Sequence, residues 1–221
     1  MRLKFLFCAL HADDFFHSFV NCHLTAHQHK LKQRITDYEH IVSTLAFSPV
    51  SPDSFSSTIY ETSHLFVLGD FNFRLDIPPS HSLSGREDFA HAIESEQARA
   101  DLKEFDQLTR ERRKGTVLVS LREGEFWKFK CSYKYHLGEV DKYRWVSPSH
   151  WFENALTMFQ KCSLARTPSW TDRVLYTTYT DPPDEPDKSD ITNLLYTSIP
   201  SYTTSDHVCF SWNFSSFPSL F

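Results

Sequence analysis

Short apolar runs that end in polar residues constrain the fold of this chain more than any other feature of its sequence. Residues 65–68 are consecutive apolar residues that stop at Gly69, which is typical of a short, buried central strand. Between Leu31 and Leu45, apolar residues recur at helical spacing and predict an amphipathic helix. Further apolar runs predict strands at residues 5–10, 19–24, 174–176 and 208–214.

The remaining segments indicate helices and loops. Residues 86–113 are rich in helix formers and lack Gly and Pro, which predicts two helices. Residues 126–135 mix aromatic residues with lysines, as an exposed strand or a binding loop does, and residues 151–161 are either a short helix or irregular. The Ser/Pro-rich segment 48–57 and the acidic, Pro-rich segment 181–187 predict solvated surface loops. Strands mixed with helices predict a layered α/β sandwich that displays polar side chains at its strand ends.

Composition narrows the class of protein. With 221 residues the chain can form one domain with a substantial core. Its net charge of −5 argues against a broad surface for nucleic acids or other polyanions, which would need clustered Lys and Arg. The five cysteines are scattered and form no C-x-x-C pair, which indicates a reduced, intracellular protein.

The first residues have two interpretations. Arg2 and Lys4 followed by an apolar run superficially resemble a secretory signal. The run is short and ends at His11 and Asp13, so we expect a core strand instead. No apolar run approaches the ~20 residues that a membrane span needs, so we expect any contact with lipid to be peripheral.

Asp70 and Asn72 follow directly after the strand predicted at residues 65–68. In an extended chain, side chains at positions i and i+2 point the same way. A carboxylate beside an amide suits a site that orients water and binds a transferring phosphoryl oxygen. The alternative is an Asx-rich turn that merely closes the strand.

Two other short segments carry similar groups. Asp206 and His207 place a carboxylate next to an imidazole at a predicted strand start, where they can bind a metal and contact phosphate. Asp172 and Arg173 follow Trp170, and their alternative explanation is an aromatic strand with a surface ion pair. Each segment alone is a weak indication of function.

Histidines and an aromatic–basic cluster complete the candidate groups. The spacing of His23, His27 and His29 is not that of a helical zinc motif, so a zinc site is not favoured. His23 is better interpreted as a phosphate-contacting imidazole, or as a core histidine bonded to backbone. Tyr133 and Lys134 could stack on nucleic acid, hold a phosphorylated sugar-like ring, or belong to a solvated edge strand.

Taken together, these segments resemble the inositol polyphosphate 5-phosphatase family of the endonuclease/exonuclease/phosphatase superfamily. The resemblance spans nearly the whole chain, and the matching segments appear in the family's order. They are residues 19–27 (V-N-x-H-L-x-A-H), 69–75 (G-D-x-N-x-R-L), 106–108 (D-Q-L), 123–124 with 132–135 (E-G … T-Y-K-Y), 168–175 (P-A-W-C-D-R-I-L) and 205–207 (S-D-H).

The resemblance implies a deoxyribonuclease I-like fold, in which two packed sheets are flanked by helices. It also implies Mg²⁺-dependent removal of the 5-phosphate from phosphoinositides or inositol polyphosphates. Asp70 and Asn72 would then position or activate the attacking water. His23 and His207 would contact the scissile phosphate, and Asp172 would orient His207 by a hydrogen bond.

The same resemblance implies a metal ligand and substrate-binding residues. Asp206 would lie near the metal, and Lys134 is the best candidate for holding the neighbouring ring phosphate. The residues expected to bind substrate are His27, Arg74, Tyr133, Lys134 and Arg173. Departures from the family pattern near Lys134 affect the expected ring-phosphate preference. The departures near Lys134 are Cys131 and His136, and the others are Ser169 and Thr171 around Trp170 and Cys209 after the Ser-Asp-His segment.

The largest departure from the family is at the front of the chain. The family's domain begins with strands that carry an Asn and a metal-binding Glu, followed by a G-N-K-G segment, and none of these precedes residue 1. We therefore expect residues 1–215 to be an N-terminally truncated catalytic domain and residues 216–221 to be a short tail. Such a chain should bind Mg²⁺ weakly, have impaired activity and be poorly stable.

Three functions are consistent with these observations. The leading one is a monomeric, cytoplasmic 5-phosphatase that contacts membranes peripherally and binds no nucleic acid. The second is a catalytically inactive fragment that binds phosphoinositides or a protein, and the expected absence of the metal-binding Glu favours it. The third is a nuclease or sphingomyelinase of the same fold, which Tyr133, Lys134 and the acidic net charge disfavour.

Overall fold

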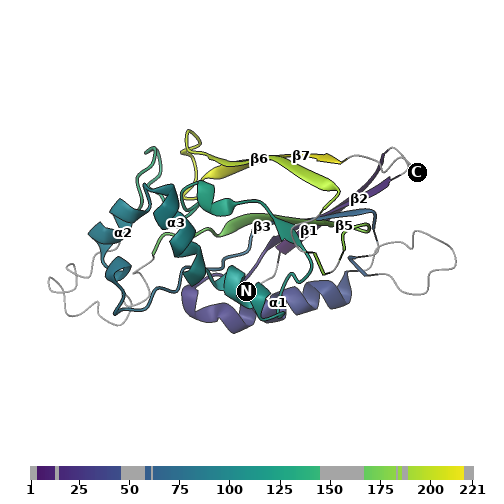
Figure 1. The fold of residues 1–221 in the computed structure, drawn as a ribbon, viewed down its shortest axis with the longest axis horizontal. Helices are drawn as coiled ribbons and strands as arrows, with labels where there is room; N and C mark the ends of the chain where they lie inside the picture. Colours follow the sequence, from purple (N-terminus) through teal and green to yellow (C-terminus); the bar gives the residue numbers. More distant parts are fainter. Residues whose placement is uncertain are drawn as a thin grey trace.

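The computed structural model describes most of the chain (Figure 1). The predictions made for residues 48–57 and 151–161, and for residues 217–221 of the expected tail, lie outside the described residues. The described residues are 4–12, 15–45, 58–60, 62–144, 167–182, 184–185 and 189–216.

A five-stranded mixed sheet is the central element of the fold. β1 (Lys4–Ala12) pairs antiparallel with β2 (Phe15–His23), which pairs parallel with β3 (His64–Asp70). β5 (Asp172–Thr178) lies antiparallel to β3 and pairs with the short strand β4 (Arg122–Glu123). The strand order is β1-β2-β3-β5-β4, so the first strand forms an edge of the sheet and not its centre.

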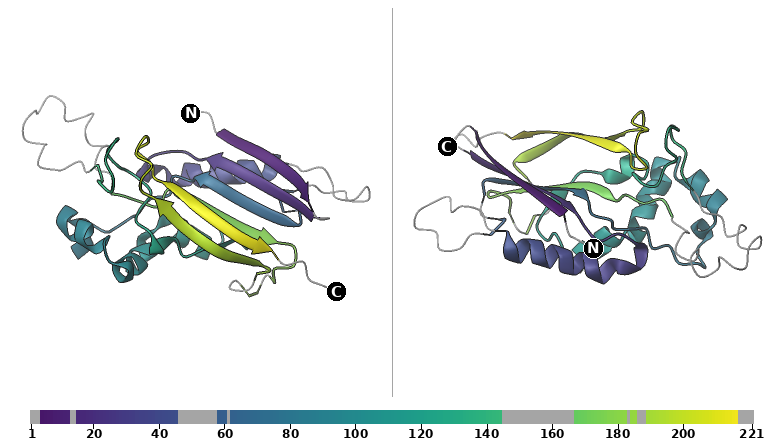
Figure 2. Two further views of the ribbon diagram at one scale, coloured as in Figure 1. Left: turned by 90° about the horizontal axis from the view of Figure 1, so that it is seen from above. Right: turned by 180° about the vertical axis from the view of Figure 1, so that it is seen from behind.

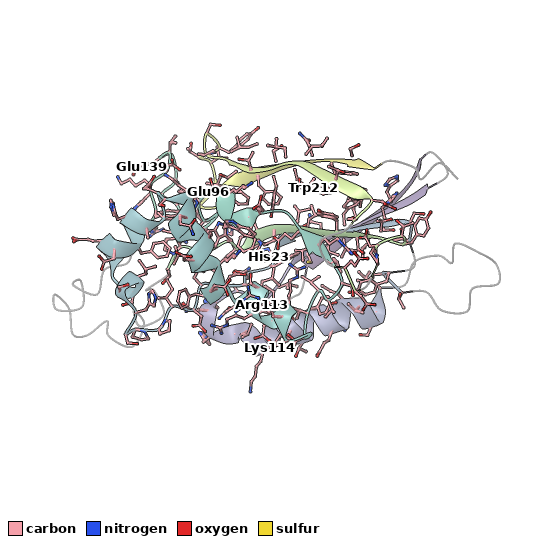
Figure 3. The ribbon with its side chains drawn as sticks, in the orientation of Figure 1. His23, Glu96, Arg113, Lys114, Glu139 and Trp212 are labelled. Carbon is pink, nitrogen blue, oxygen red and sulfur yellow. The ribbon has the colours of Figure 1, made fainter. Side chains whose placement is uncertain are left out.

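A second, two-stranded sheet faces the first (Figures 1 and 2). It consists of β6 (Ile191–Ile199), which the sequence did not predict, and β7 (Cys209–Ser216). Trp212 of β7 lies between the sheets (Figure 3). Its ring meets that of Phe66 on β3 at a centroid distance of 5.2 Å. The predicted two-sheet sandwich is therefore confirmed.

The amphipathic helix predicted between residues 31 and 45 is α1 (Leu31–Thr44), which covers the other face of the large sheet (Figure 1). Its apolar side chains pack against Val20 of β2, Val67 of β3 and Leu175 of β5. Burial of this stripe stabilises the helix more than its intrinsic propensity does. Within the described part of the chain, no helix combines the length and apolar character that crossing a membrane requires.

Residues 86–113 form three α-helices, so the prediction of two was wrong. They are α2 (Arg86–Ala92), α3 (Glu96–Leu102) and α4 (Gln107–Arg113). Ser95 caps α3 by accepting from the backbone N–H of Ala98, and Asp106 caps α4 in the same way through Thr109. The described chain also contains short 3₁₀ helices at η1 (Gln28–Lys30), η2 (Ser82–Ser84), η3 (Lys103–Phe105) and η4 (Phe126–Lys128).

The segment 126–135 is not an exposed strand, which corrects the first of the two alternatives that the sequence offered. After η4 its chain runs through the interior, and Cys131, Ser132, Tyr133 and Tyr135 are all buried. Trp170 fixes this path because its indole N–H donates to the Phe129 carbonyl at 3.0 Å. The aromatic residues of the segment are therefore core residues, and the segment passes directly beside the ends of β5 and β7.

The acidic loop 181–187 is anchored at its start, so it is not wholly a solvated connection. Asp181 is buried and forms an ion pair with Arg122 of β4, with 2.8 Å between the oxygen and the guanidinium nitrogen. The same guanidinium donates to the carbonyls of Pro182 and Glu185. A buried arginine thus holds the described part of this loop against the sheet edge.

Candidate active site

Three strand ends meet at one edge of the large sheet. β2 ends at His23 and β3 ends at Asp70, and their parallel register places these two residues side by side. β5 begins at Asp172, which the antiparallel register places opposite Asp70. Because strand ends display side chains that do not pack in the core, the register alone assembles an imidazole and two carboxylates.

Asp70 and Asn72 are joined by a turn and not by extended chain. Asn72 adopts a positive φ of 57°, and its backbone N–H donates to Asp70 Oδ1 at 3.0 Å. Its side-chain Nδ2 donates to Asp70 Oδ2 at 2.8 Å and to the Leu24 carbonyl at 3.2 Å. The expected pairing of amide and carboxylate is present, but it arises from an Asx turn.

Gly69 permits this turn. It has a φ of +122°, and a Cβ at this position would lie 2.3 Å from the backbone oxygen of Cys22 on the neighbouring strand. Any other residue would collide with β2 and would have to adopt a strained backbone. The glycine that ends the apolar run therefore also sets the direction of Asp70.

Arg74 lies beneath the site and supports Asn72. Its Nε donates to the Asn72 carbonyl at 3.1 Å, and its Nη2 donates to the Asn72 side-chain oxygen. The guanidinium carbon is 4.4 Å from the centre of the Tyr133 ring, and the residue is buried. The expectation that Arg74 binds substrate is corrected by this geometry, since Arg74 instead fixes which side of the Asn72 amide faces Asp70.

His207 and Asp172 form a carboxylate–imidazole pair. His207 Nδ1 lies 2.9 Å from Asp172 Oδ2, and its Nε2 lies 3.9 Å from Asp70 Oδ2. Asp172 Oδ2 also accepts from Ser132 Oγ at 2.7 Å and from Thr171 Oγ1 at 2.8 Å. The carboxylate that faces the imidazole is thus held by two hydroxyls.

His23 belongs to the same group, whereas His27 does not. His23 (labelled in Figure 3) has its Nε2 3.4 Å from Asp70 Oδ2, and about half of its side chain is exposed. The ring of His27 stacks on that of His29 at a centroid distance of 5.9 Å and is exposed. The structure therefore brings His23, and not His27, to the carboxylates.

Tyr133, Lys134 and Asp206 line the side of the site next to His207. The rings of Tyr133 and His207 lie 4.5 Å apart, and Lys134 Nζ lies 2.8 Å from Asp206 Oδ2. Burial raises the pKa of the Asp206 carboxyl, but the hydrogen bond and positive charge of Lys134 outweigh it and leave the pKa lowered. A cationic amine and a carboxylate are therefore both available beside the imidazole.

Arg173 is not a substrate-binding residue, which corrects the sequence prediction. Its side chain is completely buried, with Nη2 at 2.7 Å from Glu123 Oε2 and Nη1 at 3.1 Å from Asp106 Oδ2. Neighbouring residues of a strand point to opposite faces, so Arg173 points away from the face that Asp172 occupies. It joins β5 to β4 and to the start of α4.

Burial and like charge act on Asp70. They raise the pKa of its carboxyl to about 6, burial being the larger cause and the charge of Asp172 the second. Burial alone would lower the pKa of His207, but the hydrogen bond to Asp172 and the surrounding carboxylates raise it overall. The site thus holds a carboxylate that protonates readily beside an imidazole that readily carries charge.

Asp70, Asp172 and His207 also form a group with metal-ligand spacing, because one ligand atom from each lies within 4.8 Å of the others. Three donors already crowd Asp172 Oδ2, so a hydrogen-bonded pair with His207 explains Asp172 better than metal coordination does. Asp206 lies outside this group but has a side chain that is 36% exposed. One accessible carboxylate, completed by substrate phosphate and water, is a common way of holding Mg²⁺, so the residues present fit that ion.

Two residues that hold Asp172 were missed as functional residues. Ser132 and Thr171 are both buried and both donate to Asp172. In the sequence they stand out only as positions next to candidate residues, and Thr171 only as a departure from the family pattern. The role of Ser132 depends on a contact with a residue 40 positions away, which a single sequence does not reveal, whereas Thr171 directly precedes Asp172.

Comparison with known proteins connects this geometry to a family. The sequence profile of endonuclease/exonuclease/phosphatase family 2 matches residues 5–211. Phosphatidylinositol polyphosphate 5-phosphatase type IV of Mus musculus is 32% identical over 198 residues, which cover 86% of this chain and 26% of that protein. Phosphatidylinositol 3,4,5-trisphosphate 5-phosphatase 2 of Homo sapiens is 32% identical over 193 residues, which cover 86% of this chain and 13% of that protein. The chain therefore spans about a quarter or less of the length of these relatives.

Solved structures confirm the expected deoxyribonuclease I-like fold. The inositol polyphosphate 5-phosphatase domain of SPsynaptojanin, solved with inositol (1,4)-bisphosphate and calcium ion, matches with a TM-score of 0.67 at 24% identity and covers 94% of this chain and 49% of that chain. A Cimex nitrophorin, solved as a ferrous NO complex, matches with a TM-score of 0.58 at 19% identity and covers 96% of this chain and 59% of that chain. One fold thus serves unrelated ligands, and the assignment must come from the sequence matches. On those matches, the chain belongs to endonuclease/exonuclease/phosphatase family 2 and, within it, to the inositol polyphosphate 5-phosphatases.

Proposed function

We propose that this chain carries the catalytic centre of a phosphomonoesterase that removes the 5-phosphate from phosphoinositides or inositol polyphosphates. The observation that carries the proposal is the convergence of Asp70, His23 and the His207–Asp172 pair at one sheet edge. Membership of the family supports the same reaction, since both relatives described above are named as 5-phosphatases. The extent of the catalytic domain, 1–215, stays a prediction.

Asp70 is suited to accept a proton from the attacking water. A buried carboxylate with a pKa of about 6 is a better base near neutral pH than an exposed one. Asn72 holds this carboxylate through two hydrogen bonds, which fixes the direction from which water can approach. The new bond forms between the water oxygen and phosphorus, the bond from phosphorus to the inositol oxygen breaks, and the alcohol leaves with a proton.

The imidazoles are suited to the charge of the phosphoryl group. His207 Nε2 and His23 Nε2 both face the region beside Asp70 Oδ2, and the raised pKa of His207 favours its charged form. Phosphoryl transfer needs mainly positioning and charge stabilisation, because the protein contributes little covalent chemistry. His23 and His207 would contact the scissile phosphate, as the sequence predicted.

Asp206 would hold a Mg²⁺ ion, the metal that the family resemblance implies. When bound, such an ion neutralises charge on the phosphoryl oxygens and is worth several kcal/mol of barrier. Asp206 is accessible enough to serve, and its carboxylate is ionised because Lys134 lowers its pKa. Lys134 is itself positioned to meet a second phosphate of the ring, and its Nζ lies 5.3 Å from the centre of the buried Tyr133 ring.

Exposed apolar side chains beside the site support peripheral contact with a membrane. Leu137, Val140 and Tyr202 are 67%, 61% and 58% exposed, and we call them the apolar rim. The backbone bond from Gly138 to the Thr203 carbonyl, 2.8 Å, joins their two loops, and the flanking Tyr135 bonds to Asp206. A lipid substrate could thus reach the site while the rim contacts the bilayer, which agrees with a cytoplasmic protein that contacts membranes from outside.

The decisive experiment measures phosphate release from the soluble head group of PtdIns(4,5)P2 with Mg²⁺ or with EDTA. We expect Mg²⁺-dependent release that Asp172→Asn reduces by roughly 100-fold or more, because the imidazole loses its partner. Asp190→Asn, an exposed acid on the Thr180 side of the fold, is the matched control and should change nothing. Head-group binding by folded protein without turnover would refute the enzyme and establish the alternative, a binding fragment.

A further inference from the structure

Ser132 joins three of the segments that build the site. Its side-chain oxygen lies 2.7 Å from Asp172 Oδ2 and accepts from the backbone N–H groups of Thr171, at 3.1 Å, and Asp172, at 3.2 Å. Its carbonyl accepts from the backbone N–H of Val208 at 2.8 Å. One buried residue thus joins the segment of Lys134, the start of β5 and the segment of His207.

The direction of these hydrogen bonds can be worked out from the donors and acceptors. Two backbone N–H groups can only donate, so they occupy the lone pairs of Ser132 Oγ. Its single hydroxyl proton must then point to Asp172 Oδ2, which only accepts when ionised. Thr171 Oγ1 donates to the same oxygen, so two hydroxyl donors meet at Asp172 Oδ2.

This direction determines the state of the imidazole. A carboxylate held by donors offers only lone pairs to His207 Nδ1, so Nδ1 must carry a proton. In the neutral ring, Nε2 then bears the lone pair and faces Asp70 and the space beside it. Without the Ser132 proton, Asp172 could rotate or take up water, and either tautomer of His207 could be present.

We propose that Ser132 is a positioning residue that sets the tautomer of His207 through Asp172. The proposal rests on the proposed function for its catalytic consequence, but its structural content is independent of activity. The backbone N–H groups of Thr171 and Asp172 donate to Ser132 Oγ, and the Ser132 hydroxyl donates to Asp172 Oδ2. The proton on His207 Nδ1 is donated to the same carboxylate oxygen.

The test combines two measurements. A spectroscopic measurement uses metal-free protein, and a kinetic measurement uses Mg²⁺-loaded protein. Histidine is labelled with ¹⁵N, and the ring nitrogens of neutral His207 are observed by NMR, assigned by their loss in His207→Gln. Protonated and unprotonated ring nitrogens have well-separated shifts, so the spectrum reports the tautomer. The variants are Ser132→Ala, Ser132→Thr and Ser18→Ala, the last being a buried serine whose hydroxyl bonds only to Thr62 in the described contacts, at 2.9 Å.

We expect the wild-type ring to be protonated at Nδ1 and the Ser132→Ala ring to be a mixture of tautomers. We also expect Ser132→Ala to lower kcat about tenfold with KM within about twofold, while Ser132→Thr and Ser18→Ala keep both values. A wild-type tautomer in Ser132→Ala, or an equal loss in Ser18→Ala, would overturn the proposal.

Two further outcomes remain decisive. If the wild-type protein releases no phosphate, the proposed function fails, and the tautomer comparison alone decides the role of Ser132. If Ser132→Ala does not fold, Ser132→Cys replaces it, since a thiol fills similar space and donates only weakly. A mixed tautomer in Ser132→Cys supports the proposal, and a purely wild-type tautomer refutes it.

Discussion

The carboxylate of Asp70 illustrates how a catalytic group is made at the scale of one residue. Its backbone position follows from Gly69, its orientation follows from Asn72, and its pKa follows from burial beside Asp172. The same features that suit it to accept a proton make its ionised form costly in the folded state. The site is therefore expected to reduce the stability of the protein near neutral pH.

Replacing Asp70 by Asn tests this cost through its pH dependence. A raised folded pKa favours folding when the group is protonated, so its contribution is present below the unfolded pKa of 3.8 and is lost as pH rises through about 6. Asn cannot ionise, so we expect the free energy of unfolding of Asp70→Asn relative to wild type to improve by about 2 kcal/mol between pH 4.5 and pH 7.5. Urea unfolding in EDTA measures the free energy of unfolding of both proteins at each pH. A difference between the two proteins that stays constant across this pH range would contradict the prediction.

At the scale of elements, register and one buried ion network hold the site together. The pairing of β2, β3 and β5 aligns His23, Asp70 and Asp172. Arg173, the next residue along β5, points inward and pairs with Glu123 of β4 and with Asp106 at the start of α4. The contacts of Arg173 on one face of β5 thus fix the position of Asp172 on the other face.

Arg173→Leu should destabilise the fold severely. It leaves Asp106 and Glu123 buried beside each other without their shared cation, which costs about 3–5 kcal/mol. Arg113→Leu is the matched control, because the Arg113–Glu104 pair is exposed and should contribute less than about 1 kcal/mol. Thermal and urea unfolding measure both variants, and equal losses would disprove the structural role assigned to Arg173.

The sequence predicted those parts of the site that local patterns determine. Asp70 and Asn72 were identifiable because they directly follow an apolar run, and α1 because its apolar spacing is regular. Arg173 was misjudged because alternation along β5, which sends it inward, only becomes clear once Asp172 is known to face the site. The exposed strand expected for segment 126–135 was wrong because the path of the segment depends on contacts such as the hydrogen bond from Trp170 to Phe129, a partner far away in the sequence.

At the scale of the whole molecule, the apolar rim and the reacting groups lie on neighbouring loops. Tyr135 connects to the Asp206 carbonyl and Gly138 to that of Thr203, so the rim cannot move independently of the site. Leu194 on β6, another exposed apolar residue, belongs to the outer sheet and has no such link in the described bonds. Membrane contact, if it occurs through the rim, should therefore orient the site toward the lipid.

Aspartate substitutions of the rim test this arrangement. We expect Leu137→Asp and Val140→Asp each to lower turnover of PtdIns(4,5)P2 in vesicles roughly tenfold, because inserting a charge forfeits the burial of one apolar side chain. Turnover of the soluble head group should stay unchanged, and Leu194→Asp, which is 64% exposed in the parent protein, serves as the control. Equal losses on both substrates would mean that the substitutions damage the site itself.

The contacts that complete the site join residues that are far apart along the chain. His23 meets Asp70 across 47 positions, and Ser132 reaches Asp172 across 40. Such contacts form slowly, because the chain loses the entropy of closing a long loop before the contact can stabilise it. The helix α1 needs contacts between neighbouring residues only. Helical content should thus return early during refolding, and catalytic competence should be the last property that the chain regains.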